Sequence, residues 1–291
     1  MPAYNHEKYV EQAILSVINQ TYKNIQLIVV DDGSSDNTPN IIQRLANLYE
    51  FTYIRQENKG VCATFNYIFS LSQGDYIFDC ASDDYLEYDA IEKMIERAQR
   101  SNSDIVYGRV KMIKNDIEFG EIPFSNLEVG VLAKKKDLLI KKYRTPIGSF
   151  LYKKELLDKI MPLPLEVKLE DAYLMLKIPM STSFAAVDSI IKYYRVHDTN
   201  TVKNELKMYE SKLYILNTYY TRDTDMNGLY YYSSRAGFFK QLASKHKYIS
   251  LKYMPSAILF IFKSNFSKYA IKQFIVGLLR LININKSRIT E

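Results

Sequence analysis

Blocks of helical and strand-like periodicity alternate along the first 200 residues of the chain. Apolar positions spaced three and four residues apart predict helices at residues 10–18, 38–48, 62–71, 89–100 and 169–178. Short β-branched and apolar runs predict strands at residues 25–30, 51–55, 76–80, 105–110 and 185–194. Residues 1–6 are expected to form a loop, and residues 111–165 are less regular. This alternation predicts an α/β fold with a mostly parallel, Rossmann-like central sheet flanked by helices.

The chain after residue 204 is predicted to be a helical C-terminal extension rich in tyrosine. In its last helix, one side is apolar and basic residues lie around that side. The apolar positions are Ile271, Phe274, Ile275, Leu278, Leu279 and Ile282, and the basic ones are Lys268, Lys272, Lys286 and Arg288. Such a helix can pack against the main domain, or it can lie in the plane of a membrane surface.

Composition and charge narrow the class of protein. With 47% hydrophobic and 25% charged residues, the chain resembles an ordinary soluble globular protein. The two cysteines, Cys62 and Cys80, lie in apolar contexts, which favours structural roles and a reducing, cytoplasmic compartment. We expect no signal peptide and no membrane-spanning helix, because no apolar run approaches the required length.

The net charge of +6 is concentrated at the C-terminal end. From residue 245 onward there are nine Lys or Arg and a single acid, Glu291, which gives +8, whereas the preceding residues sum to −2. This asymmetry predicts contact between residues 245–288 and an anionic surface, such as the inner face of the plasma membrane. The basic segment lacks the interleaved exposed aromatic residues and the recognised module expected of a nucleic-acid-binding protein.

Carboxylates follow two of the predicted strands. Asp31 and Asp32 end one strand and Asp83 and Asp84 end another, so both pairs are expected at the same edge of the sheet. Clustered carboxylates repel one another unless a cation lies among them, and Mg²⁺ or Mn²⁺ held together with a nucleotide diphosphate would satisfy the arrangement. Asp171 would then be available as a general base. A single exposed Asp-Gly turn is more often structural, but the joint occurrence favours a functional site.

A cluster of lysines lies in the less regular region, at residues 134–136 and 141–142. These lysines fit either a solvated face or a contact with a substrate that carries a diphosphate group. The sequence leaves both interpretations open.

Eight short stretches occur in an order and spacing that covers roughly residues 2–200. They are residues 2–5 (PAYN), 16–22 (SVINQTY), 29–36 (VVDDGSSD), 58–61 (NKGV), 74–77 (GDYI), 82–84 (SDD), 170–171 (ED) and 194–197 (YRVH). With them, the chain resembles the family 2 glycosyltransferases of the inverting, nucleotide-sugar-dependent kind with the glycosyltransferase A fold. The resemblance implies a catalytic domain over residues 1–204, with a donor half at about 1–110 and an acceptor half at about 111–204. Residues 205–291 would follow as a helical basic region.

The resemblance also implies roles for individual residues. The residues that would contact the nucleotide-sugar are Pro2, Ala3, Tyr4, Asn5, Asp31, Asp32, Lys59, Gly60, Asn66, Ser82 and Asp84. Among these, Asp32 resembles the carboxylate that hydrogen-bonds the pyrimidine ring. Asp83 is similar to the metal-binding acid of the family's Asp-x-Asp signature, and His197 is a candidate further contact to metal or phosphate, although a histidine after a strand is often structural. Asp171 resembles the general base that deprotonates the acceptor hydroxyl.

Two departures from the family pattern stand out. Ala81 replaces the first acid of Asp-x-Asp, and Asp79 lies one residue pair too far back to substitute for it simply. The family also has an apolar strand directly before the position of Pro2, so we expect that the given sequence lacks this strand. We nevertheless expect an active enzyme, with a catalytically silent nucleotide-sugar-binding or scaffolding member as the alternative.

The expected activity is transfer of a sugar from a nucleotide diphosphate donor, with UDP preferred, to a hydroxyl of a glycan or lipid-linked saccharide. The expected partners are thus the nucleotide-sugar, this acceptor and a membrane surface, with no nucleic acid beyond the donor nucleotide. Residue types alone do not identify the sugar, the acceptor, the linkage or the oligomeric state, because pocket shape decides specificity.

Overall fold

The computed structural model describes residues 1–122, 124, 132–139, 148–198, 200, 205–220, 229–243, 250–264 and 267–281. Its contacts divide the chain into two compact units. Unit 1 comprises Met1–Ala133, Arg144–Ile178 and Thr182–Ile215, and unit 2 comprises Lys134–Tyr143, Pro179–Ser181 and Leu216–Glu291. One dividing point falls inside helix α8 (Glu205–Tyr219), and the predicted domain boundary at residue 204 stays a prediction.

The first sheet of unit 1 is entirely parallel and has the strand order β1-β2-β3. These strands are β1 (Pro2–Ala3), β2 (Ile28–Asp32) and β3 (Thr52–Gln56), and all five residues of β2 are buried. The loop predicted for residues 1–6 is therefore wrong at Pro2–Ala3, where pairing with β2 decides the structure of a segment too short to show periodicity. β2 also differs from the prediction, because it begins at Ile28 and includes Asp31 and Asp32.

The second sheet of unit 1 has the order β4-β9-β6-β10-β5, with β7 on β6 and β8 on β10. Its strands are β4 (Tyr76–Phe78), β5 (Tyr85–Leu86), β6 (Ile105–Lys114), β7 (Ile117–Glu121), β8 (Ala133–Lys134), β9 (Phe150–Lys153) and β10 (Ser183–Arg195). The central pair, β6 and β10, is parallel, while β9 and β5 pair antiparallel with their neighbours. Parallel-containing sheets flanked by helices confirm the predicted α/β class.

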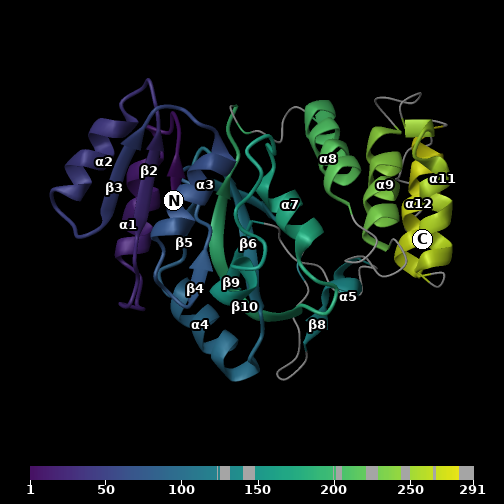
Figure 1. The fold of residues 1–291 in the computed structure, drawn as a ribbon, viewed down its shortest axis with the longest axis horizontal. Coiled ribbons are helices and arrows are strands. Elements are labelled where there is room, and N and C mark those ends of the chain that lie inside the picture. The colour runs from purple at the N-terminus through teal and green to yellow at the C-terminus, as the bar shows by residue number, and fades with distance from the viewer. Residues whose placement is uncertain are drawn as a thin grey trace. The chain divides into compact units, whose positions relative to one another are not determined.

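All five predicted helices of unit 1 are present (Figure 1). They are α1 (Val10–Ile18), α2 (Thr38–Ala46), α3 (Val61–Leu71), α4 (Ala90–Ser101) and α7 (Glu170–Lys177), and a short α6 (Lys154–Leu157) follows β9. Helix α1 buries Val10, Ala13, Ile14 and Val17, the face that its three-and-four spacing predicts. Helices α2 and α3 pack on the first sheet, α1 packs on α2 and β5, and α4 packs on β6 and β10.

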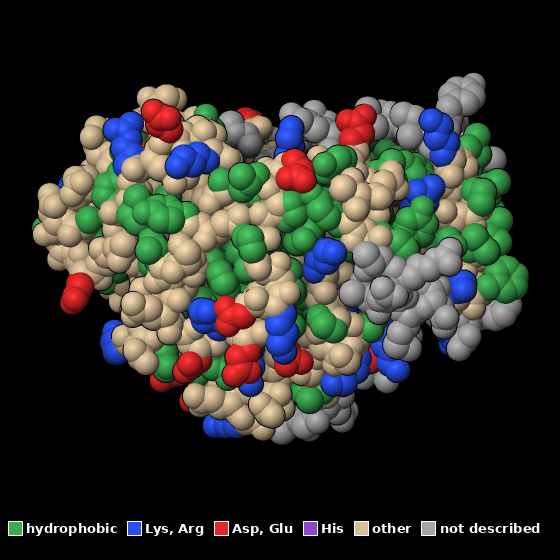
Figure 2. Space-filling view, viewed as in Figure 1, with side chains coloured by type: hydrophobic (Ala, Val, Ile, Leu, Met, Phe, Trp, Pro, Cys, Tyr) green, Lys and Arg blue, Asp and Glu red, His purple; other side chains and the backbone are tan. Residues whose placement is uncertain are grey.

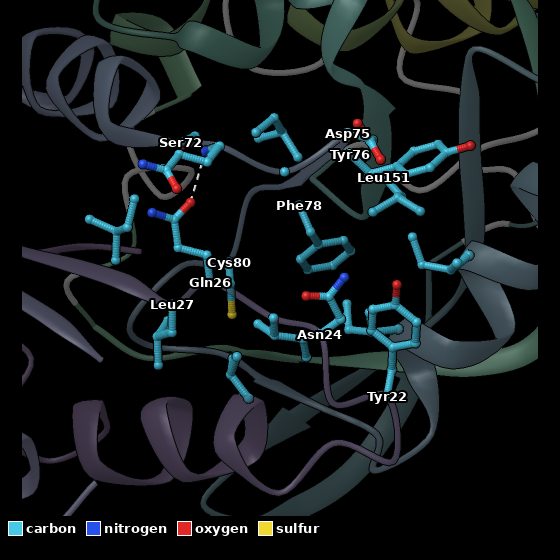
Figure 3. Close-up of a pocket in the computed structure, with 18 of the residues that line it drawn as sticks. Tyr22, Asn24, Gln26, Leu27, Ser72, Asp75, Tyr76, Phe78, Cys80 and Leu151 are labelled. Carbon is cyan, nitrogen blue, oxygen red and sulfur yellow. Dashed lines mark hydrogen bonds between the residues drawn. The ribbon is translucent and has the colours of Figure 1, made fainter. Parts of the chain in front are cut away.

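A slot of about 480 Å³ lies between β2 and β4, with polar side chains such as Asn24, Gln26 and Asp75 in its lining (Figure 3). Apolar side chains from both sheets and from α1 and α4 line it, and they include Val17, Leu27, Ile28, Phe78, Leu86, Ile91 and Leu151. Met1 lies at the slot, where its ammonium group donates to Ile28 O (2.7 Å) and its carbonyl accepts from Val30 N (3.0 Å). Met1 thus continues the parallel ladder of β1. The predicted absence of a strand before Pro2 stays a prediction.

Unit 2 contains α5 (Lys135–Leu139), α9 (Leu229–Leu242), α11 (Met254–Lys263) and α12 (Lys268–Leu281), with α9 in contact with the other three. On α12 the buried side consists of Ala270, Gln273 and Gly277, and the ring of Phe239 covers Gly277. Two residues of the predicted apolar side, Ile271 and Ile275, are exposed. Ile282, Lys286 and Arg288 lie outside the described residues.

The lysine cluster divides between different environments. Lys135 is fully buried at the start of α5, so the solvated-face interpretation is wrong for this residue, whereas Lys136 is exposed. Because residues 134–136 are all lysines, the sequence contains no apolar pattern that would show which of them faces the interior of the protein. Lys141 and Lys142 lie outside the described residues.

Candidate active site

The carboxylate of Asp32 organises the end of β2. Its Oδ1 accepts hydrogen bonds from Gln56 Nε2 (2.7 Å) and Lys59 N (2.8 Å), and its Oδ2 accepts one from Gly60 N (2.9 Å). Gly60 is the N-cap residue directly before α3 and has a positive φ of 86°, which favours glycine. Because each carboxylate oxygen can accept two hydrogen bonds, Oδ2 keeps one acceptor position.

Asp31 and Gly33 shape the turn that follows. Asp31 is fully buried, and its Oδ1 accepts a hydrogen bond from Ser34 N (3.3 Å) while its Oδ2 lies 3.3 Å from Arg55 Nε. Gly33 has a φ of 75°, and a Cβ there would lie 2.7 Å from the backbone N of Asn58. Glycine therefore allows the turn after β2 to approach the next loop closely.

Asn5 joins the loop after β1 to the turn after β2. Its backbone N donates to Ser34 Oγ (2.9 Å), and its side-chain Oδ1 accepts from Ser35 N (2.8 Å). Asn5 has a φ of 53°, a conformation that asparagine tolerates better than most residues. The neighbouring Tyr4 side chain is exposed. The predicted nucleotide-contacting residues from Pro2 to Asp32 are thus held side by side by strand pairing and these bonds.

Three side chains from distant segments meet beside this loop. His197 Nε2 lies 3.0 Å from Asp83 Oδ2, and His6 Nε2 lies 3.9 Å from the same oxygen. One possible ligand atom from each of the three residues lies within 4.8 Å of the others. Burial lowers the pKa of His6 below its usual value, although the charge of Asp83 opposes this shift. The cluster therefore offers two imidazoles and a carboxylate in one small region.

Arg195 and Tyr9 hold two members of this cluster in place. The buried Arg195 guanidinium lies 4.7 Å from the centre of the Tyr9 ring, and its Nε donates to Asp83 O (3.3 Å). Tyr9 in turn stacks on His197 with the ring centres 4.9 Å apart. Aromatic stacking and a cation over a ring each add a modest stabilisation.

Asp84, predicted to adjoin the donor, forms a buried ion pair. Its Oδ2 lies 2.7 Å from Lys192 Nζ, and its Oδ1 accepts a hydrogen bond from Arg195 N (2.9 Å). Lys192 Nζ also donates to Gly148 O (2.9 Å). Burial by itself would lower the pKa of Lys192, but the charge and the hydrogen bond of Asp84, together with smaller contributions from Cys80 and Asp79, raise the pKa above its usual value. Both side chains therefore support β10 and the acidic turn, and the predicted donor contact of Asp84 stays a prediction.

Asp171 lies near the N-terminus of α7 in a group of three acids. Its Oδ1 accepts a hydrogen bond from Ala172 N (2.6 Å). Burial, with the negative charges of Asp79 and Asp171, raises the pKa of Glu170 to about 8. Burial also raises the pKa of Asp79. Glu170 is thus protonated at neutral pH beside Asp171.

Asn66, another residue predicted to lie near the nucleotide, makes a pair of hydrogen bonds with the backbone of Leu163. Its Oδ1 accepts from Leu163 N (2.7 Å) and its Nδ2 donates to Leu163 O (2.8 Å). Among the described residues, three contribute to the site without having been predicted from the sequence: His6, Tyr9 and Lys192. His6 directly follows the PAYN stretch, and this adjacency was the one signal that could have identified it.

Comparison with known families decides the class of this site. The model of glycosyl transferase family 2 matches residues 1–161, which is more than half of the chain. The chain belongs to this family. The resemblance drawn from the eight sequence stretches is therefore confirmed.

Several relatives in family 2 align with different parts of the chain. An uncharacterized glycosyltransferase of Haemophilus influenzae is 27% identical over 250 residues, covering 82% of this chain and 95% of that protein. Glycosyltransferase GlyA of Streptococcus pneumoniae is 36% identical over 109 residues, but the match covers 37% of this chain and only 16% of GlyA. The aligned region is therefore a small part of the much longer GlyA.

Solved structures confirm the glycosyltransferase A fold of this family 2 chain. Staphylococcus aureus TarS in complex with UDP-GlcNAc has a TM-score of 0.61 at 16% identity, covering 96% of this chain and 88% of that one. A mannosyltransferase from Pyrobaculum calidifontis, in complex with GDP-Man and Mn²⁺, has a TM-score of 0.52 at 16% identity, covering 95% and 85%. Within the described residues, no helix has the length and hydropathy needed to cross a membrane.

The cluster of His6, Asp83 and His197 fits a divalent metal ion. Imidazole nitrogens and carboxylate oxygens are ordinary ligands of such ions, and three ligand atoms from the chain leave coordination positions for phosphate oxygens. It is the single group of this kind among the described residues.

Proposed function

We propose that this protein is an inverting glycosyltransferase that moves a sugar from a nucleotide diphosphate, with UDP preferred, to a hydroxyl of a glycan or lipid-linked saccharide in cell-surface polysaccharide biosynthesis. The observation that carries the proposal is the meeting of the N-terminal loop, the acidic turn and the segment after β10 at Asp83. Family membership supports the transferase class. The UDP-GlcNAc and GDP-Man complexes of the structural neighbours support a nucleotide-sugar donor.

The donor would occupy the region where the loop after β1 meets the turn after β2. Asp32 Oδ2, with its remaining acceptor position, would accept a hydrogen bond from the pyrimidine ring. The flanking residues Pro2–Asn5, Asp31, Lys59 and Gly60 would line the base and ribose, and Asn66, Ser82 and Asp84 would lie around the rest of the nucleotide-sugar.

Asp83 and His197 would hold a divalent ion, Mn²⁺ or Mg²⁺. When bound, this ion would offset the negative charge of the diphosphate as it becomes the leaving group. The stacked Tyr9 and the guanidinium of Arg195 would keep both side chains oriented toward the diphosphate.

Asp171 would act as the general base. Its carboxylate would take the proton of the acceptor hydroxyl while that oxygen attacks the anomeric carbon. The bond between this carbon and the diphosphate oxygen would break on the opposite face, so that the configuration inverts. The proton on Glu170 would limit the negative charge that surrounds Asp171 at neutral pH.

Substitution of Asp171 tests this assignment. Asp171→Asn keeps the size of the side chain but removes its basicity, so transfer should fall by about 10²- to 10⁴-fold. Binding of UDP in the presence of Mn²⁺, measured by isothermal titration calorimetry, should change little. Asp188→Asn, at an exposed position, serves as the control. Loss of UDP binding in Asp171→Asn would instead assign Asp171 to the donor site.

The membrane part of the proposal rests on α11 and α12. Figure 2 shows hydrophobic side chains gathered over this part of the molecule with basic side chains among them. The exposed apolar residues include Ile258, Leu259, Phe262, Ile271 and Ile275. The exposed Lys263, Lys268 and Lys272 accompany them, and residues 250–281 contain no acid. Apolar bulk with lysine is the pattern of a surface that binds anionic membranes, here at the cytoplasmic face.

Sedimentation with lipid vesicles tests this surface. The wild-type protein should bind vesicles that contain phosphatidylglycerol and not vesicles of phosphatidylcholine alone, and Phe262→Ser with Ile275→Ser should weaken binding. Leu48→Ser with Ile117→Ser, also at exposed apolar positions, serves as the matched control. Binding to RNA but not to anionic vesicles would overturn this part of the proposal.

A further inference from the structure

We propose that His6 is a third protein ligand of the divalent ion, so that two imidazoles and one carboxylate hold it. The inference rests on the proposed function, because it concerns the ion assigned there to Asp83 and His197. It adds a ligand from the N-terminal loop, and it predicts which metal ions the site prefers.

The backbone of His6 is held independently of its side chain. Its N donates to Thr38 Oγ1 (2.8 Å), and its carbonyl accepts from Tyr9 N and Val10 N (2.9 Å each) at the start of α1. The imidazole is therefore presented from a fixed point at the junction of the loop and α1. A substitution of this side chain leaves these backbone bonds available.

Ser82 orients the imidazole of His6. His6 Nδ1 lies 2.8 Å from Ser82 Oγ, and Ser82 is fully buried. With the proton on Nδ1 and donated to this hydroxyl, Nε2 presents its lone pair toward Asp83. A hydrogen bond from the second ring nitrogen is the usual arrangement around a histidine that binds a metal.

The distances permit a single ion to reach all three side chains. With metal–ligand bonds of about 2.1 Å, two adjacent ligands lie roughly 3 Å apart and two opposite ligands roughly 4 Å apart. His197 Nε2 lies 3.0 Å from Asp83 Oδ2, and His6 Nε2 lies 3.9 Å from it. Shifts of less than about 1 Å, within the reach of small side-chain rotations, would complete the coordination.

His6 also supplies a metal ligand that the acidic turn at residues 81–83 lacks. The turn reads Ala81-Ser82-Asp83, so a single acid of this segment reaches the cluster, and the methyl group of Ala81 cannot bind a metal. The residue next to Ala81 is the serine that orients His6. The turn therefore provides one ligand directly and places a second, from the N-terminal loop, through a hydrogen bond.

This set of ligands favours transition-metal ions over Mg²⁺. Mg²⁺ prefers carboxylates, phosphates and water, whereas imidazole suits the first-row transition metals. We therefore infer that the site binds Mn²⁺ and the later transition-metal ions more tightly than Mg²⁺, so that Mg²⁺ competes poorly.

Electron paramagnetic resonance of Mn²⁺ tests the inference without an activity assay. Titration measures free Mn²⁺ and hence the dissociation constant, and pulsed spectra detect the nitrogen nuclei of bound imidazoles. Wild-type protein with UDP should bind one Mn²⁺ with signals from two imidazoles. His6→Gln should weaken binding by about tenfold or more and remove one signal. His246→Gln, at the third histidine of the chain, should do neither.

Ser82→Ala and competition with Mg²⁺ complete the experiment. Ser82→Ala should weaken Mn²⁺ binding less than His6→Gln does and retain both nitrogen signals. A roughly 100-fold excess of Mg²⁺ should leave most Mn²⁺ bound to the wild-type protein but displace it from His6→Gln. The unfolding midpoint of each variant shows whether it is folded, and His6→Ala replaces His6→Gln if the latter is not.

The possible failures are distinguishable. If His6→Gln binds Mn²⁺ like the wild-type protein, with unchanged nitrogen signals, the assignment of His6 is wrong and the proposed function stands. If the wild-type protein with UDP binds no Mn²⁺, both the His6 assignment and the metal part of the proposed function are overturned.

Discussion

Two of the hollows in unit 1 are similar in size but differ in the types of residue that line them. The cleft beside His6 and His197 has a volume of about 540 Å³, and the slot between β2 and β4 has about 480 Å³. Charged and polar side chains such as Lys114, Asp116 and Arg195 line the cleft, whereas most side chains that line the slot are apolar and its polar ones, such as Asn24 and Gln26, are mostly uncharged. Volume therefore does not distinguish the candidate active site from a gap between the two sheets.

The hydrogen bonds around the two hollows explain the difference. Beside the cleft, Asp83, Asp84 and Arg195 are connected by hydrogen bonds and ion pairs to several elements. At the slot, β4 is the edge strand of its sheet, and Met1 contributes a buried ammonium group. The polar groups beside the first hollow are held in fixed positions, as the proposed donor site requires, whereas the second hollow lies beside a strand edge, where we expect that an additional strand could pair.

The largest expected effect concerns the ion pair that supports the cleft. Lys192→Met should destabilise the fold by about 3–5 kcal/mol, because it leaves Asp84 buried without a countercharge. Chemical denaturation measures this change. Lys154→Met, which removes the half-exposed pair with Asp158, should cost about 0–1 kcal/mol. If the two variants lose equal amounts of unfolding free energy, the buried pair of Lys192 and Asp84 stabilises the fold no more than an exposed pair does.

An intermediate effect concerns pH and the acids near Asp171. Between pH 4.5 and about 8 the unfolded chain ionises Glu170 while the folded chain keeps its proton, since burial raises its pKa to about 8. The folded state then binds more protons, so the free energy of unfolding falls as pH rises, by at most about 1.4 kcal/mol per pH unit.

Glu170→Gln should remove this dependence. The variant should match the wild-type protein near pH 4.5 and become the more stable of the two by up to about 4 kcal/mol toward pH 8. Glu155→Gln, at an exposed position, is the control. Denaturation curves that stay parallel for wild type and Glu170→Gln across this range would contradict the raised pKa.

The smallest expected effect concerns the slot. An extension of four residues before Met1, with valine and isoleucine in alternation, should form a strand in the slot and raise the free energy of unfolding by about 1–2 kcal/mol. The gain from burying its apolar side chains exceeds the conformational entropy that these residues lose. The extension also replaces a buried ammonium group, whose pKa burial lowers, with a neutral amide. An extension of four glycine and serine residues should have no such effect. If the two extensions behave alike, the slot is not a strand site.

Local periodicity predicted the regular elements, because α1 and α4 each bury the face that their apolar spacing defines. It also predicted that Asp32 and Asp83 follow strands and that Asp171 lies at the start of a helix. It could not predict β9 within the irregular region, since its pairing with β4 and β6 is decided by distant segments. Nor could it predict His6 beside Asp83 or the ion pair of Lys192 with Asp84, because these contacts join segments far apart in the chain.

Release of UDP from a panel of UDP-sugars with Mn²⁺, followed by nuclear magnetic resonance of the freed sugar, tests the central claim most directly. The wild-type protein should release UDP from at least one α-linked donor and yield the β-anomer first. Asp171→Asn should release little UDP while it still binds the nucleotide. No turnover of any donor with any divalent ion would favour a catalytically silent protein that binds nucleotide-sugars, and an α-anomer as the first product would contradict inversion.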